Sequence, residues 1–97
     1  MKPVRVHPQA EAEADGALEY LWARSESAAL GFDAELRIAF GALRENPRIY
    51  APYLLGTRRI MLHRYPFFVV FRESPRKIQI IAVVHAKRRP GYWTNRL

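Results

Sequence analysis

The sequence predicts an α+β domain in which an antiparallel sheet, made of one strand and a later three-stranded meander, carries two helices packed on one face. Two observations predict this class. Between residues 9 and 46 apolar residues recur at helical spacing, and between residues 58 and 86 they alternate or run together, as they do in strands. The composition agrees, because 49% of the 97 residues are hydrophobic and 26% are charged, as in globular proteins. We expect one domain, residues 1–97.

The N-terminal half begins with a short strand and continues as two helices. Residues 3–7 alternate apolar and polar side chains and predict the strand. Pro8 and the acidic residues after it favour the start of a first helix, which extends from about residue 9 to 24. Ser25 lies in a short break and offers an N-cap for a second helix, from about residue 28 to 46, which an Asn-Pro step ends. So short a connection predicts an antiparallel helical hairpin.

The C-terminal half reads as a loop followed by three strands. Residues 48–57 contain proline and glycine and predict the loop. The strands are expected at residues 58–64, 67–72 and 77–86, and the turns between them contain Tyr-Pro and Ser-Pro-Arg. Consecutive strands with short turns pair antiparallel. We therefore expect a meander, with one sheet face under the helices and the other exposed.

The positive charge lies almost entirely in the C-terminal half. Residues 1–50 contain 6 Lys and Arg against 8 Asp and Glu, a net charge of −2, whereas residues 51–97 contain 10 against 1, a net charge of +9. Such a field favours a polyanion or an acidic protein partner. The charge is densest in residues 85–97, where cations are interleaved with two aromatic residues, a composition typical of surfaces that bind phosphate and bases.

These last residues are our expected target-binding surface. The residues that we assign to it are Lys87, Arg88, Arg89, Tyr92, Trp93 and Arg96. Two alternatives stay open at this point. The arginine pair could be a solvated charge run, and the two aromatic side chains could fold back to cover the sheet.

Several classes of protein are excluded by what the sequence lacks. The absence of cysteine excludes disulfides and thiolate metal sites and is usual in a reducing compartment. The three histidines have no metal-ligand spacing, so we expect no metal and no other cofactor. No apolar run approaches the roughly 20 residues that span a bilayer, and the N-terminus has no signal core. We expect a cytoplasmic protein without membrane association.

Four short motifs, in this order, support a family assignment. They are Val-Arg-Val-His-Pro-Gln-Ala at 4–10, Leu-Arg-Glu-Asn-Pro at 43–47, the strand pair Arg-Arg-Ile-Met-Leu and Tyr-Pro-Phe-Phe-Val-Val-Phe-Arg within 58–72, and Val84-His85 with basic residues close behind. Together they span nearly all of the chain. The chain thus resembles toxins of the RelE/ParE superfamily, from bacterial type II toxin–antitoxin modules.

The resemblance implies a growth inhibitor that a cognate antitoxin neutralises by wrapping it with an extended or helical segment. ParE-like members inhibit DNA gyrase, whereas RelE-like members cleave messenger RNA on the ribosome. RelE-like enzymes carry an arginine where this chain has Phe68, and an arginine followed six residues later by a tyrosine where it has Lys87 and Trp93. We therefore expect a ParE-like toxin that targets gyrase. A RelE-like ribosome-dependent mRNA endonuclease is the alternative, and a non-catalytic basic nucleic-acid-binding module is a further one.

Whether the chain is an enzyme is left open by the sequence. Cleavage of RNA through its 2′-hydroxyl group needs a base, an acid and a cation for the phosphorane. His85 and His63 could supply the first two, and Arg59 the third. Strict alternation along the strands places these polar side chains on the exposed sheet face, where they need not be buried. The other interpretation of His85 is structural, as a hydrogen-bonding residue at the end of its strand.

Overall fold

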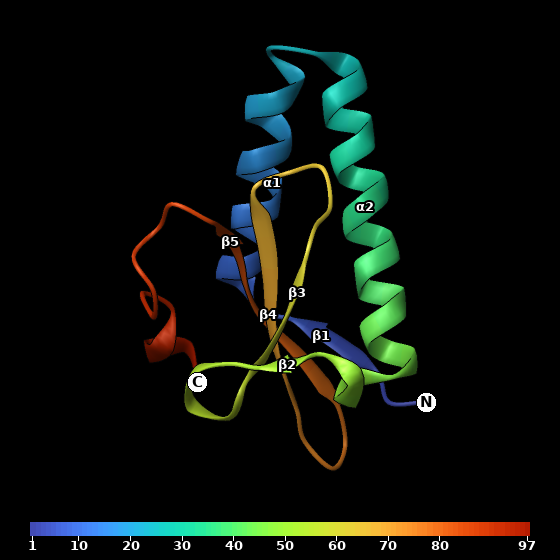
Figure 1. Cartoon of the computed structure of the whole chain (residues 1–97), viewed down its shortest axis with the longest axis vertical. Coiled ribbons are helices and arrows are strands. Elements are labelled where there is room, and N and C mark those ends of the chain that lie inside the picture. The colour runs from blue at the N-terminus through green and yellow to red at the C-terminus, as the bar shows by residue number, and fades with distance from the viewer.

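The computed structural model describes all residues 1–97 and contains two helices and one five-stranded sheet (Figure 1). The predicted α+β class is confirmed. In chain order the helices and strands are β1 (Val4–Val6), α1 (Pro8–Trp22), α2 (Glu26–Glu45), β2 (Ala51–Pro52), β3 (Arg58–Met61), β4 (Phe67–Glu73) and β5 (Ile78–His85). Short 3₁₀ turns lie at Pro47–Ile49, Leu54–Gly56 and Thr94–Arg96.

The strands are arranged in the order β1-β5-β4-β3-β2. The antiparallel meander of β3, β4 and β5 is as predicted. Strand β1 pairs parallel with β5, with Val4 opposite Ile78, so the sheet is mixed rather than wholly antiparallel. The reason is the helical hairpin, which carries the chain over one face from the β1 edge to the β2 edge. A crossover of this kind allows parallel pairing, whereas a tight turn does not.

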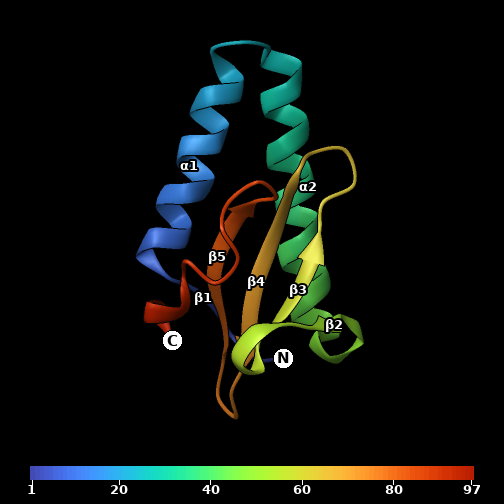
Figure 2. The same ribbon diagram turned by 60° about the vertical axis from the view of Figure 1, so that its left-hand side comes forward.

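Both helices lie on the same face of the sheet, and the far end of their hairpin extends beyond it (Figure 2). Each helix begins with a side-chain cap. The Nδ1 atom of His7 accepts a hydrogen bond from the backbone N–H of Gln9 at 3.1 Å, and the hydroxyl of Ser25 accepts one from Ala28 at 3.2 Å. Apolar residues of α2 and the sheet form the main core, which contains Phe32, Leu36, Leu43, Val69, Phe71, Ile78, Ile80 and Val83. Neither helix is long and apolar enough to span a bilayer.

A β-bulge interrupts the alternation of β5. Val70 lies opposite Ala82 and the next residue of β4 lies opposite Ile80, so Ile81 is the extra residue. Before the bulge, Ile80 faces the helices, and after it Val83 does. The expectation of strict alternation along this strand is therefore wrong beyond Ile81, because the bulge moves the side chains from Ala82 onward to the opposite face.

The other face of the sheet is covered as well. A second core, in which Phe68, Val70, Ile81, Ala82 and Val84 contact Trp93, lies on the side away from the helices. The segment after β5 returns to the sheet and covers it (Figure 1). Burial on both faces explains why β4 and β5 are almost continuously apolar.

Candidate functional site

The segment after β5 begins with an exposed turn, residues 87–89, which we call the basic loop. Lys87, Arg88 and Arg89 are all solvent-exposed. His85 fixes the start of the turn, because its Nδ1 atom accepts a hydrogen bond from the Lys87 N–H at 3.1 Å and its carbonyl accepts one from the Arg88 N–H at 2.9 Å. The guanidinium of Arg88 lies over the ring of Tyr92, 3.8 Å from its centroid. Three cations therefore project from a turn whose backbone is held.

Trp93 does not belong to an exposed target-binding surface. Its side chain is 0% exposed and packs in the second core, where its ring lies 5.9 Å from that of Tyr53. The assignment of Trp93 to target binding is wrong, because no part of the indole reaches solvent. The alternative left open by the sequence, that this aromatic residue folds back onto the sheet, is the observed one.

Tyr92 and Arg96 bind a carboxylate of the first helix. The guanidinium of Arg96 donates to Glu13 through Nη1 at 2.8 Å and Nη2 at 3.1 Å, and the hydroxyl of Tyr92 donates to the same carboxylate. The Arg96 side chain is only 8% exposed. We call Glu13, Tyr92 and Arg96 the Glu13 clasp. The target-binding assignment of Arg96 is thus wrong, because its guanidinium is bound to Glu13. The Tyr92 side chain contacts both Glu13 and Arg88.

The clasp changes the titration of Tyr92. Burial and the hydrogen bond to Glu13 together raise the pKa of the Tyr92 hydroxyl above its ordinary value. A tyrosine in the unfolded chain has a pKa of about 10. Folding therefore favours the neutral hydroxyl. Its contribution to the free energy of unfolding is complete below the pKa of the unfolded chain and is lost as the pH rises above that value. We expect unfolding by urea, measured between about pH 9 and 11, to show a steeper loss of stability in the parent chain than in Tyr92→Phe. Equal slopes would contradict the clasp.

The three candidate catalytic residues do not converge. Arg59 lies on the sheet face away from the helices, with its guanidinium 4.3 Å from the ring centroid of Tyr53 and 5.1 Å from that of Phe68. His85 lies on the helix side, where its ring packs edge-to-face against Phe67 at 5.0 Å. The expectation of a shared face is wrong for His85, because the bulge in β5 reverses its orientation.

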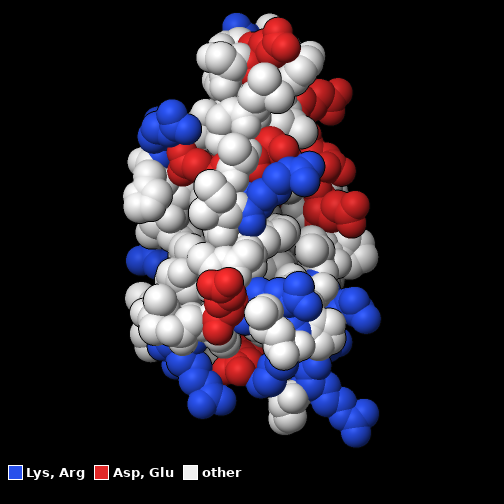
Figure 3. Space-filling view, turned by 90° about the vertical axis from the view of Figure 1, so that its right-hand side faces the viewer, with Lys and Arg blue, Asp and Glu red and all other residues white.

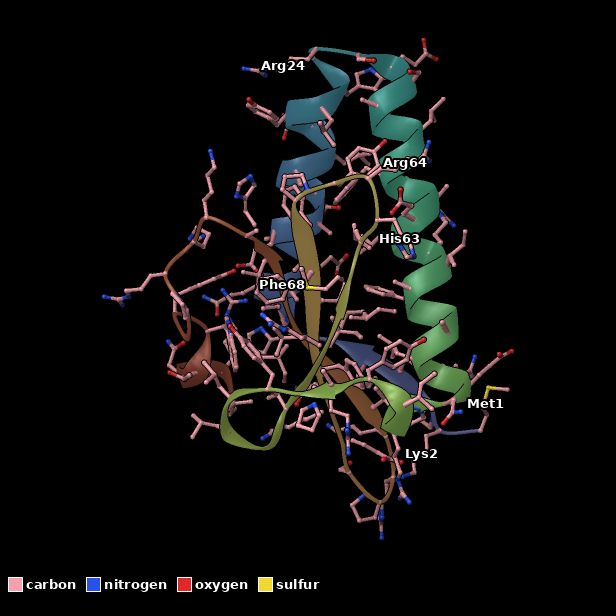
Figure 4. All side chains as sticks on the ribbon, viewed as in Figure 1. Met1, Lys2, Arg24, His63, Arg64 and Phe68 are labelled. Atoms are coloured by element: carbon pink, nitrogen blue, oxygen red, sulfur yellow. The ribbon has the colours of Figure 1, made fainter.

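His63 follows β3 and lies beside α2, as does Arg64 (Figure 4). The His63 N–H donates to the Glu35 carboxylate at 2.8 Å, and Arg64 Nε donates to it at 2.9 Å. Partial burial raises the pKa of Glu35, but these hydrogen bonds outweigh it and hold the pKa below its ordinary value. His63 is therefore part of a helix-to-strand contact. No group of three or more His, Cys, Asp or Glu side chains lies where it could hold a metal ion.

A groove runs between α2 and the outer edge of β3. Its volume is about 500 Å³, and 9 of its 12 lining residues are hydrophobic. We call it the α2–β3 groove; its lining includes Ile38, Ala42, Ile49, Ile60 and Met61. Figure 3 views the α2 side of the molecule, where Lys and Arg gather toward the lower end and most Asp and Glu lie over the upper half. An uncharged surface lies between them.

Comparison with known proteins agrees with this architecture. The sequence model of a family described as the ParE toxin of the type II toxin–antitoxin system, parDE, matches residues 4–90. Among solved structures, a chain from the chromosomal ParDE toxin–antitoxin system of P. aeruginosa has the same fold, with a TM-score of 0.76 and 22% sequence identity over 90% of this chain and 98% of that one. A comparison with curated proteins finds no match. The family match covers most of the sequence, and this chain belongs to the ParE toxin family of type II toxin–antitoxin systems.

Proposed function

We propose that this chain is a ParE-like growth inhibitor that acts on DNA gyrase in the cytoplasm and is neutralised by a cognate antitoxin. The observation that carries the proposal is the family match over residues 4–90. The geometry supports it against the mRNA endonuclease, because His85 lies on the helix side of the sheet, whereas the guanidinium of Arg59 packs against Tyr53 and Phe68 on the other side. A ribonuclease needs its acid, base and cation within reach of one phosphate.

The basic loop is the surface that we propose for the target. Lys87, Arg88 and Arg89 are the predicted target-binding residues that are exposed. The loop that carries them is held at one end by β5 and at the other by the Glu13 clasp. Loops that carry charge on a rigid scaffold are common binding sites, because little ordering is needed when the partner binds.

The α2–β3 groove is the surface that we propose for the antitoxin. Along β3, alternate residues direct their backbone groups toward opposite neighbours. Leu62 donates its N–H to the Phe67 carbonyl on β4. The backbone groups of Met61 and His63 therefore point away from β4, toward the outer edge of the strand. Strand β2 pairs only with Arg58 and Arg59, and its ladder ends before Met61 is reached. Glu35 already accepts the His63 N–H, so the open part of this edge is at Met61, beside the apolar groove.

An open strand edge next to apolar side chains fits an extended or helical segment with apolar residues. The segment would place those residues against Ile38 and Met61, which are exposed on the rim of the groove. The +9 charge of residues 51–97 favours a segment that also carries acidic residues, because opposite charge accelerates association. An antitoxin tail of this chemistry would cover the groove.

We expect Ile38→Glu to weaken antitoxin binding at least tenfold. Ile38 is 71% exposed, so a charge at this position is tolerated in the free chain, but it would be desolvated without a partner under an apolar segment. Leu30→Glu is the matched control, because Leu30 lies on the same helix, is 55% exposed and does not line the groove. Titration calorimetry measures both variants. Parent-like affinity of Ile38→Glu, or equal weakening by the two variants, would place the antitoxin elsewhere.

The proposed target is tested by adding the purified protein to two reactions, one for each candidate target. One reaction contains gyrase and relaxed plasmid, and the other is a cell-free translation whose messages are examined for cleavage. We expect supercoiling to be inhibited and the messages to remain intact. Codon-specific cleavage with unaffected supercoiling would show that the chain is a ribosome-dependent endonuclease. Salt-dependent DNA binding without effect on either reaction would favour a non-catalytic nucleic-acid-binding module.

A further inference from the structure

The edge of β5 is only partly covered by a neighbouring strand. Strand β1 pairs with Ile78 to Ile80 and then leads into helix α1. Beyond this point two side chains take up the free backbone groups. Glu13 accepts a hydrogen bond from the Val83 N–H at 3.1 Å, and Arg96 donates one to the Ile81 carbonyl at 3.1 Å. The first helix and the C-terminal turn thus meet at the open part of the sheet edge.

The ion pair at this point is well shielded from solvent. The side chains of Glu13 and Arg96 are 16% and 8% exposed, and two N–H groups of the guanidinium donate to the two carboxylate oxygens. A two-pronged pair of this kind fixes orientation as well as distance. Removing one partner at such low exposure leaves the other without compensation. The negative charge of Glu13 therefore helps to hold the C-terminal turn against the sheet, together with the buried Trp93.

The same carboxylate is linked to the basic loop through Tyr92. The hydroxyl of Tyr92 donates to Glu13, and its ring lies under the guanidinium of Arg88. Between His85 and Tyr92 the chain spans only a short turn, which passes through Gly91 with a φ of +78°. Both ends of this turn are held by hydrogen bonds, one set at β5 and one at Glu13. The position of the loop's cations thus depends on a residue of α1.

We propose that Glu13 is the positioning residue of the basic loop, which it holds in the shape that binds the target. This inference rests on the proposed function, because it takes the loop to be the target-binding surface. Glu13 itself is covered by the C-terminal turn and acts through Tyr92 and Arg96. The basic loop therefore depends on a buried contact between the first helix and the last residues of the chain.

The test is Glu13→Gln, which preserves size and one acceptor oxygen but removes the charge. We expect the concentration that half-inhibits gyrase to rise at least tenfold, while antitoxin affinity changes less than twofold, because the α2–β3 groove lies at the opposite edge of the sheet. Amide hydrogen exchange should accelerate in residues 92–97 and remain unchanged in α2. Glu11→Gln is the matched control, since Glu11 is exposed on the same helix, and it should behave like the parent.

Two results would overturn the inference. One is parent-like inhibition by Glu13→Gln, with or without faster exchange in the C-terminal turn. The other is an equal loss of gyrase inhibition and antitoxin binding in a variant that circular dichroism shows to be folded, which would mean that Glu13 has no selective effect on the basic loop. If Glu13→Gln does not fold, Tyr92→Phe takes its place, because it removes only the link between Glu13 and the loop. It should raise the half-inhibiting concentration without affecting antitoxin binding, and parent-like inhibition would again overturn the inference.

Failure of this inference is distinguishable from failure of the proposed function. Inhibition of gyrase by the parent chain tests the proposed function, and removing the three cations of the basic loop tests that loop as the target surface, whatever the role of Glu13. If the loop variant loses inhibition and Glu13→Gln retains it, only the positioning role is wrong. If the loop variant inhibits gyrase like the parent chain, the loop is not the target surface and the positioning role fails with it, whereas gyrase remains the target. If the parent chain does not inhibit gyrase, the proposed function itself fails.

Discussion

Replacing Trp93 with alanine is expected to lower the free energy of unfolding by about 3–5 kcal/mol, the range for large aromatic residues in a core. Trp93 is fully buried and is the largest member of the second core, where it contacts residues of β4 and β5. Its loss would leave a cavity between the C-terminal turn and the sheet that the short turn is unable to refill. Urea unfolding followed by circular dichroism measures the change.

Two controls sharpen this prediction. Trp22→Ala removes the same side chain from a helix surface where it is 54% exposed, and should change stability by less than about 1 kcal/mol. Trp93→Phe should cost much less than Trp93→Ala, because it preserves an aromatic ring and removes an indole N–H that has no hydrogen-bond partner. If Trp93→Ala were no more destabilising than Trp22→Ala, the C-terminal turn would not be packed on the sheet.

Replacing Lys87, Arg88 and Arg89 together with alanine is expected to abolish growth arrest at expression levels at which the parent chain stops growth. The three side chains are exposed and none forms an ion pair, so the fold and antitoxin binding should be preserved. Growth after induction, with protein levels measured in parallel, gives the result.

A second triple variant separates the effect of the basic loop on toxicity from the effect of the overall charge. Arg24, Arg76 and Lys77 are exposed outside the basic loop, and their replacement with alanine removes the same net charge. This control should still arrest growth. If both triple variants lost toxicity equally, the effect would come from the overall positive charge of the chain, +7, rather than from the loop.

The fold was largely predictable because its elements carry clear periodicity. The face of α2 that contains Phe32, Leu36 and Leu43 has helical spacing, and the strands of the meander are joined by short turns. The bulge at Ile81 was not predictable, because a run of apolar residues fits either face of a strand that is buried on both sides. The parallel pairing of β1 was likewise hidden, since it depends on where the hairpin returns the chain.

The candidate site was predictable only in its exposed part. The basic loop was found from its charge, but the interleaving of cations with aromatic residues does not reveal whether an aromatic ring faces solvent or a core. The partner of Arg96 is Glu13, 83 positions earlier in the chain, and no local pattern connects them. One signal was available: the continuous apolar run from Phe67 to Phe71 predicts burial on both faces of β4, and therefore a second covering layer.

The most direct test of the account measures inhibition of purified gyrase by the parent chain and by the Lys87, Arg88 and Arg89 triple alanine variant. We expect the parent chain to inhibit supercoiling, the antitoxin to relieve that inhibition, and the variant to need at least a tenfold higher concentration while still binding the antitoxin. Equal inhibition by the two proteins would contradict the assignment of the basic loop as the target surface, and the absence of inhibition by the parent chain would contradict gyrase as the target.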